Sequence, residues 1–453
     1  MARKTVDFNK SGIGKLPDNK PALYRIQTDS GKTNYAGIAK RGRIQERLEE
    51  HLPGGKDYVP GSKVQIEQMK SVDQARAKAR QPMNDLINKR LKIARMKAGL
   101  TQVQLAEKLG FKDRQTLAAI EAGQRKMSAE ELLRAMDVFG LDLDYFSDGF
   151  RLVGEGRFSW RADKNATEAL LGAFEHRAGC WVATYRRLCE WQGIKTDLLQ
   201  VHLPLNERSS FEDAVAAGEA LGAEWKLGDQ PAITLDQAIQ EHLRALVLYV
   251  EAPKGISGAA CKVPGANAIL INRREPEGRR NFDLAHEVFH LLTWEQMPPE
   301  HKEAIEVNHR GKGRHKRIEQ LADNFAAALL MPERELEPLW MARSDENINV
   351  WLNRTAPAFL VSAKALKWRL TNLGWISKAG QMDIHDGKLT ANGRPAREQQ
   401  IPRLFCEEFV RRLHTGLAKG QLSVRRAASL LEMTIEDLAQ LFRDYQFPVP
   451  YDL

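Results

Sequence analysis

Cysteine is scarce in this chain: the 453 residues include only four, Cys180, Cys189, Cys261 and Cys406. None of them stands in CxxC spacing, which excludes the common cysteine-based metal motifs. So few cysteines also exclude a disulfide framework of the kind that stabilises small secreted domains. We expect reduced, mostly buried thiols, as in a cytoplasmic protein, and assign them no part in metal binding.

Long apolar runs are also missing. No segment approaches the roughly 18 consecutive apolar residues of a membrane-spanning helix, and residues 1–5 are not followed by the apolar core of a secretory signal. The apolar share of 43% is ordinary for a globular protein. A chain of this length holds about two to four domains. We therefore expect a multidomain cytoplasmic protein with no membrane partner.

Positive charge is unevenly distributed. Residues 1–100 carry 22 Lys and Arg against 10 Asp and Glu, a net charge of +12, whereas the whole chain carries +9. The remaining residues therefore sum to −3. A basic block of this kind is typical of a surface that binds nucleic acid, although a basic domain without such a partner remains an alternative.

Residues 286–290 read HEVFH, which is the pattern HExxH. On a helix, positions i and i+4 share a face, so His286 and His290 can reach one metal ion. Glu287 can then act as a general base on a water molecule whose pKa zinc lowers to roughly 7. Apolar residues dominate the flanks within residues 282–292 and predict a buried helix. In such a helix two histidines and a glutamate need a partner.

A third ligand is expected from residues 318–332, IEQLADNFAAALLMP, whose alanines and leucines favour a helix. Glu319 and Asp323 are four residues apart and therefore share a face of that helix. We expect Glu319 to bind the metal and Asp323 to accept a hydrogen bond from a ligand imidazole.

One class of zinc peptidase places a glycine and a third histidine after the second ligand, but Thr293 and Gln296 occupy those positions. That class is excluded. His301, His309 and His315 remain alternative third ligands, although they lie in a charged, lysine-rich stretch that is typical of a solvated loop.

The segments FDLAHEVFHLL and IEQLADNFAAALLMP resemble the ImmA/IrrE metallopeptidases, over residues 150–375. The resemblance implies a mainly helical, zincin-like metallopeptidase domain with a small sheet. It implies a gluzincin-like endopeptidase with Zn2+ as cofactor, His286, His290 and Glu319 as ligands and Glu287 as general base. It also implies the substrate class, since the family typically cleaves a helix-turn-helix repressor.

Residues 86–146 show a five-helix pattern with short turns. Thr101 is an expected N-cap, Gly110 ends the helix that follows it, and residues 113–121 form the next helix. This order predicts a helix-turn-helix, and GLTQVQLAEKLG and RQTLAAIEAGQRK resemble lambda-repressor-like (XRE) domains. Binding to another protein remains an alternative to binding DNA.

In that layout the second helix of the pair enters the major groove of double-stranded DNA. Arginine reads guanine and glutamine reads adenine, and the expected base-facing residues are Arg114, Gln115 and Ala118. Phosphate contacts fix the register without reading the sequence, and they are expected from Gln102, Arg125 and Lys126.

Residues 20–81 form a separate basic unit. Residues 22–26 and 35–37 predict a hairpin with its turn at residues 29–31, and a basic helix follows over residues 43–52. The paired tyrosines and the helix arginine resemble those of GIY-YIG nucleases, and they are Tyr24, Tyr35 and Arg47.

The same resemblance requires a later glutamate that holds a divalent metal. Ala79 occupies that position, with Gln81 nearby, and neither provides a carboxylate. The resemblance therefore implies a degenerate nuclease module that contacts DNA without cutting it. An unrelated small basic α/β domain remains an alternative.

We predict a multidomain α+β chain. Its expected parts are a small N-terminal α/β module, an all-α helix-turn-helix domain, the metallopeptidase domain and a helical C-terminal segment, over residues 1–81, 82–149, 150–382 and 395–453. Residues 150–165 are expected to form a linker. A second, weaker helix-turn-helix-like pair is expected near the C-terminus.

Two functions remain open. The first is a DNA-binding, zinc-dependent endopeptidase that cleaves a helix-turn-helix repressor or related regulatory protein in stress, mobile-element or phage-defence regulation. Its substrate would lie as an extended strand along residues 267–272. The second is a transcriptional regulator with a structural or sensory metal site and no proteolysis. Glu287 favours the first, because a structural site does not need it.

The setting implied by these readings is the cytoplasm of a bacterium, at its nucleoid, with the gene carried by the bacterium or by a phage or mobile element. The expected partners are double-stranded DNA and a protein substrate. Homodimerisation is left open.

Overall fold

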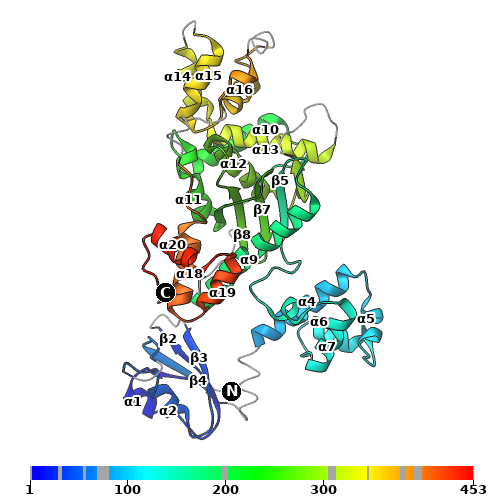
Figure 1. The fold of residues 1–453 in the computed structure, drawn as a ribbon, viewed down its shortest axis with the longest axis vertical. Helices are drawn as coiled ribbons and strands as arrows, with labels where there is room; N and C mark the ends of the chain where they lie inside the picture. Colours follow the sequence, from blue (N-terminus) through cyan, green and yellow to red (C-terminus); the bar gives the residue numbers. More distant parts are fainter. Residues whose placement is uncertain are drawn as a thin grey trace. The chain divides into compact units, whose positions relative to one another are not determined.

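The protein is described from a computed structural model, which covers residues 3–28, 33–54, 58–68, 81–194, 202–304, 313–343, 346–377, 384–390 and 400–451 (Figure 1). It is a multidomain α+β protein, as the sequence predicts. The chain divides into two compact units. One consists of Met1–Val153 with Cys189–Lys195, and the other of Gly154–Leu188 with Thr196–Leu453.

The N-terminal module is an antiparallel sheet with two short helices. Its strands are β1 (Arg3–Asp7), β2 (Ala22–Gln27), β3 (Thr33–Ala39) and β4 (Lys63–Gln68), and its helices are α1 (Lys10–Gly14) and α2 (Ile44–Glu49). The strands lie in the order β1-β4-β2-β3, with every neighbouring pair antiparallel. β2 and β3 form the predicted hairpin, and α2 is the predicted basic helix.

Five helices follow, as the sequence predicts: α4 (Gln81–Lys97), α5 (Gln102–Lys108), α6 (Arg114–Glu121), α7 (Ala129–Phe139) and α8 (Leu143–Ser147). Thr101 begins α5 through a capping box with Gln104, which satisfies two backbone N–H groups at once. Asp113 caps α6 by accepting from the backbone N–H of Thr116. The helices share one apolar core, which includes Leu91, Leu105, Leu117 and Phe146.

The second unit contains a five-stranded mixed sheet in the order β6-β8-β7-β5-β9. The strands are β5 (Arg157–Ala162), β6 (Leu246–Val250), β7 (Ile256–Val263), β8 (Ala266–Asn272) and β9 (Lys302–Ala304). β7 is antiparallel to β5 and β8, whereas β6 and β9 are parallel to their neighbours. Among the described strands, β6 and β9 therefore form the two edges.

The prediction that residues 150–165 form a linker is wrong, because this segment contains strand β5. Residues 158–162 are buried, and β5 lies between β7 and β9. Arg157 and Arg161 give the short segment a polar appearance in the sequence. Its pairing partners, residues 256–263 and 302–304, are about a hundred residues or more away in the sequence. No local sequence pattern therefore predicts the strand.

Helices α9 (Glu168–Gln192), α10 (Phe211–Glu224), α11 (Pro231–Leu243), α12 (Glu277–Thr293) and α13 (Arg314–Leu330) accompany the sheet. α12 packs on β7 and β8 and along α13, and α13 packs on α10 (Figure 1). α12 and α13 are the two helices predicted from the HExxH segment and from residues 318–332. Their apolar faces form the main core, which includes Ala285, Val288, Phe289 and Phe325.

Two smaller helical groups complete the second unit. The first contains α14 (Glu333–Met341), α15 (Ile348–Thr355) and α16 (Ala363–Asn372), with 3-10 turns η1 (Ala356–Phe359) and η2 (Asp386–Lys388). The second contains α18 (Glu407–Ala418), α19 (Val424–Leu431) and α20 (Ile435–Asp444), and α19 and α20 are the helix pair predicted near the C-terminus. Between the two groups, the backbone N–H of Phe405 donates to the carbonyl of Tyr249 on β6 over 2.7 Å.

The four cysteines are free thiols, and three of them are buried. Within the part of the chain that the structure describes, no helix is long and apolar enough to span a bilayer.

Gly218 lets α10 approach α13 closely, and this contact supports the helix that carries Glu319. A Cβ at Gly218 would lie 2.5 Å from the carbonyl oxygen of Phe325 and 3.1 Å from the backbone nitrogen of Leu329. We expect Gly218→Ala to lower the free energy of unfolding by about 2 kcal/mol or more, because neither backbone atom can yield. Chemical denaturation of the full chain measures this effect.

Gly172→Ala is the matched control. This glycine is exposed on α9, and a Cβ there would meet nothing within 4 Å. Alanine is the better helix former by roughly 0.5–1 kcal/mol, so the control should be stabilising. Equal effects of the two substitutions would contradict the close packing of α10 on α13.

Candidate metal centre

α12 brings the two histidines of the HExxH pattern together in the interior. The side chains of His286, Glu287 and His290 are all 0% exposed. The Nε2 atoms of the two histidines lie 3.0 Å apart. This follows from their i, i+4 spacing on one helical face, which is turned toward α13 and the sheet.

α13 supplies Glu319 to the same point. Its Oε2 lies 3.2 Å from His286 Nε2, and its Oε1 lies 3.5 Å from His290 Nε2. The structure therefore brings together the three residues that the sequence singled out as metal ligands.

A fourth residue, Glu303, completes the cluster from strand β9. Its Oε2 lies 3.2 Å from His290 Nε2. One donor atom from each of Glu303, Glu319, His286 and His290 can be chosen so that all four lie within 4.8 Å of one another. Sequence reasoning missed Glu303, because it is one of several glutamates in the charged stretch 300–317 and has no helical spacing to the other three donors.

The donor atoms fit a small divalent cation. Zinc bonds to imidazole nitrogen and carboxylate oxygen are about 2.0–2.2 Å, so tetrahedral ligand atoms lie roughly 3.3–3.6 Å apart. The separations of 3.0 to 3.5 Å are close to that spacing. Both carboxylate oxygens of the buried Glu287 also lack hydrogen-bond partners. Such orphaned carboxylate oxygens are costly to bury without a counterion.

Asp323 contacts His286 at Nδ1, whereas Arg161 contacts it at Nε2, the nitrogen that also faces Glu319 and His290. Asp323 Oδ1 lies 2.9 Å from His286 Nδ1, as the spacing of Asp323 from Glu319 led us to expect. Arg161, from β5, donates from Nη1 to His286 Nε2 over 2.8 Å and pairs through Nε with Asp283 at 2.9 Å. Sequence reasoning missed Arg161 because it assigned residues 150–165 to a linker.

The cluster holds more negative than positive charge. Burial raises the pKa of the Glu287 carboxyl well above its usual range. Burial, and then the neighbouring charge of Glu303, raise the pKa of Glu319. Burial lowers the pKa of His290 to about 3. A divalent cation binds ionised carboxylates and neutral imidazoles, and it therefore favours these forms of both groups. Its binding would offset the cost of ionising the buried carboxyls.

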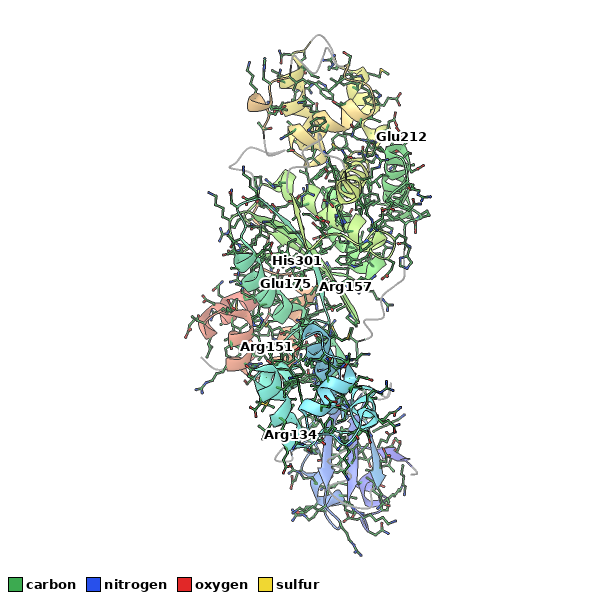
Figure 2. All side chains as sticks on the ribbon, turned by 90° about the vertical axis from the view of Figure 1, so that its right-hand side faces the viewer. Arg134, Arg151, Arg157, Glu175, Glu212 and His301 are labelled. Carbon is green, nitrogen blue, oxygen red and sulfur yellow. The ribbon has the colours of Figure 1, made fainter. Side chains whose placement is uncertain are left out.

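The alternative third ligands do not approach this centre. His301 is half-exposed, and its Nε2 lies 2.7 Å from Glu175 Oε2 on α9 (Figure 2). His315 is exposed and faces Glu300 at 3.3 Å. His309 lies outside the described residues. No described histidine therefore competes with Glu319 as the third metal ligand.

The prediction that a substrate would lie as an extended strand along residues 267–272 is wrong. These residues lie on β8, which pairs with β6 on one side and β7 on the other. Neither edge of β8 is free to accept a peptide, because both rows of backbone hydrogen-bonding groups are already paired.

The expected base-facing residues lie on α6. Arg114 and Gln115 are exposed in its first turn, and Ala118 is half-buried one turn later. An exposed first turn agrees with a recognition helix that presents its N-terminal residues to base edges.

The expected phosphate-contacting residues differ in their surroundings. Gln102 begins α5 and donates from Nε2 to Glu121 over 2.9 Å. Arg125 pairs with Glu131 at 2.7 Å. Lys126 is exposed. The donor groups of Gln102 and Arg125 would therefore have to be shared between these internal glutamates and a phosphate.

In the N-terminal module Tyr24 is buried on β2, and its hydroxyl lies 2.9 Å from His51 Nε2. Arg47 lies on α2 and pairs with Glu50. Tyr35 lies on β3, where its backbone pairs with Ile26. The position occupied by Ala79 lies outside the described residues, so the nuclease resemblance stays a prediction.

The structure thus contains one domain with a helix-turn-helix pair and another with a buried cluster of histidines and glutamates. Residues 91–146 match the helix-turn-helix family. Residues 240–371, which contain α12, β9 and α13, match the IrrE N-terminal-like domain of the M78 peptidases. The chain therefore combines a helix-turn-helix domain with an IrrE-like peptidase domain. No curated protein matches the chain.

Proposed function

We propose that this protein is a DNA-binding, zinc-dependent endopeptidase that cleaves a helix-turn-helix repressor or a related regulatory protein. The observation that carries the proposal is the environment of Glu287. Both of its carboxylate oxygens are buried without a hydrogen-bond partner, on the helix that supplies His286 and His290. A buried carboxylate that binds nothing is costly, and a role in proton transfer accounts for it.

Each of these side chains would have a separate role in the proposed hydrolysis. His286, His290 and Glu319 would hold the metal, and Asp323 would keep the proton of His286 on Nδ1 so that Nε2 faces the metal. When bound, zinc lowers the pKa of water toward 7 and polarises a carbonyl group. Glu287 would accept the proton of the attacking water and deliver it to the leaving amine. The raised pKa of Glu287 suits it to carry that proton between the two steps.

A direct experiment tests this function. The purified full chain is incubated with candidate helix-turn-helix repressors encoded at the same locus, with Zn2+ or with a chelator, and the products are identified by mass spectrometry. We expect cleavage of one repressor at a defined bond only when Zn2+ is present. Absence of metal-dependent cleavage of every such repressor would contradict the substrate assignment.

The helix-turn-helix domain would bring the peptidase to DNA. A protease held on DNA near a bound repressor meets that repressor at a raised effective concentration. In this proposal the protein would act at the bacterial nucleoid, in the cytoplasm, and a homodimer would suit a two-fold operator. The basic N-terminal module would add a degenerate, non-cleaving DNA contact.

Replacing Arg114 by alanine is expected to weaken binding to the preferred duplex by about 1–3 kcal/mol, or roughly 5- to 150-fold, because a paired arginine–guanine contact is lost. The duplex is first selected from a random pool, and affinity is then measured by fluorescence anisotropy at two salt concentrations. Binding of both proteins should weaken steeply with salt, since phosphate contacts remain.

Arg134→Ala is the control for charge. Arg134 is exposed on α7, outside the helix pair α5–α6 (Figure 2). Its loss should affect all duplexes alike and only slightly. Salt-independent binding, or equal losses for the two substitutions on the selected duplex, would argue that this domain binds protein instead of DNA.

One observation favours the second function, a regulator with a structural or sensory metal site. Glu303 offers a fourth protein donor, and structural zinc sites usually have four protein ligands, whereas catalytic sites keep one position open. Glu287 remains unexplained in a purely structural site, so we retain the peptidase as the primary proposal.

A further inference from the structure

Glu303 reaches the cluster from a different part of the fold than the other donors. His286 and His290 share α12, and Glu319 comes from the adjacent α13. Glu303 comes from β9, described over Lys302–Ala304, which lies at an edge of the sheet among the described strands. Three of the four donors are therefore fixed by the packing of two long helices, whereas the fourth depends on the placement of β9.

Among the described residues, β9 is held by its pairing with β5 and by side-chain contacts at its start. Its register with β5 consists of Trp160 with Lys302, Arg161 with Glu303 and Ala162 with Ala304. The backbone N–H of Trp160 also donates to the carbonyl of His301 over 2.9 Å. Two side chains hold the start of the strand. His301 contacts Glu175 (Figure 2), and Lys302 Nζ donates to the carbonyl of Ala166.

The side chain of Glu303 is nonetheless deeply placed. Glu303 is 4% exposed, and its Oε2 lies as close to His290 Nε2 as Glu319 Oε2 lies to His286 Nε2, at 3.2 Å in both cases. Within the described part of the chain its ion-pair contact is with His290, and Arg161 stands opposite it in the pairing of β5 with β9. A buried carboxylate in this position is accounted for most directly by a shared cation.

Four protein donors fill a tetrahedral coordination shell. Hydrolysis needs a position for water and for the substrate carbonyl. We infer that Glu303 is a fourth metal ligand, and that it closes the centre until it is displaced. This inference rests on the proposed metal-dependent function and assigns to β9 the control of access to the metal. The protein is then a latent peptidase, and a peptide or partner that draws β9 away from β5 would open its active site.

The test uses the full chain reconstituted with Co2+ as the probe, because visible cobalt absorption reports the number and type of ligands. In the wild type we expect a four-coordinate spectrum that azide does not change, since no position is open. In Glu303→Gln we expect an altered spectrum that shifts on titration with azide. We also expect metal affinity to fall on the order of 10- to 100-fold or more, since even hydrogen-bond partners of ligands contribute that much.

Three further variants separate the outcomes. Glu300→Gln removes an exposed carboxylate from the same segment, and it should match the wild type in spectrum and affinity. His290→Ala should lose cobalt binding. Glu303→Asp keeps the charge and shortens the side chain, so it should open the site to azide even if the glutamine variant folds poorly.

The inference is overturned if azide already shifts the wild-type spectrum and the Glu303 variants are indistinguishable from it. That result would leave the proposals of a metal centre and of a peptidase intact. It would refute only the proposal that Glu303 closes the metal centre. If the wild type binds no cobalt, the metal centre falls together with the proposed function. If cobalt behaves as expected but no protein is cleaved, Glu303 stands as a ligand and the peptidase proposal alone fails.

Discussion

Glu287→Gln is expected to abolish proteolysis while the metal remains bound. The amide keeps the size of the side chain but cannot accept the proton of the attacking water, and general-base catalysis typically contributes about 10²- to 10⁴-fold. Cleavage of the substrate repressor should fall by at least that range, whereas the metal content, measured by elemental analysis, should equal that of the wild type. Glu287 is not among the four residues whose donor atoms converge, which is why its loss should leave the metal in place.

The stability of the same variant provides a second readout. Glu287 is fully buried and both oxygens lack partners, and an amide costs less to bury than a carboxylate. The variant should therefore melt at a temperature no lower than the wild type. Glu295→Gln, which removes an exposed carboxylate just beyond α12, is the control and should retain activity. Loss of metal or of folding in Glu287→Gln would favour a structural role for the site.

Removal of the metal should abolish cleavage and lower the melting temperature of the second unit. Without a cation, Glu303 and Glu319 face each other in the interior, and burial raises the pKa of both carboxyls. A ligand present at about a thousand times its Kd stabilises the folded state by about 4 kcal/mol. For a domain of this size, that corresponds to roughly 8–16 °C in Tm.

Differential scanning calorimetry with chelator, and then with Zn2+ restored, measures this shift. The helix-turn-helix domain serves as an internal reference, because its core contains no part of the cluster. His290→Ala should make the transition of the second unit insensitive to chelator. If the wild-type transition is equally insensitive to chelator, the cluster binds no metal that stabilises the second unit.

Local sequence patterns predicted the helices of both domains well. The i, i+4 spacing of His286 and His290 places both side chains on one face whatever surrounds the helix. The same is true of Glu319 and Asp323 on α13. In the helix-turn-helix domain, Thr101 and Asp113 mark helix starts by chemistry that acts within three residues. Such signals need no knowledge of the rest of the chain.

The strands were predicted less well, and the errors share one cause. β5 was assigned to a linker, and β8 was offered as a docking edge although it lies between β6 and β7. A strand can be recognised as an edge or an interior strand only when its neighbours are known, and those neighbours lie far away in the sequence. The residues that depend on strand pairing, Arg161 and Glu303, were missed for the same reason.

The sequence by itself determined the two helices that carry His286, Glu287, His290 and Glu319, and the helix-turn-helix pair, because helical periodicity and capping are local properties. Only the tertiary structure decided what faces those residues. It placed Arg161 of β5 against His286 and Glu303 of β9 against His290, because sheet order is set by pairing between distant segments. Whether the centre is open or closed therefore depends on the fold, although its first three ligands can be named from the sequence.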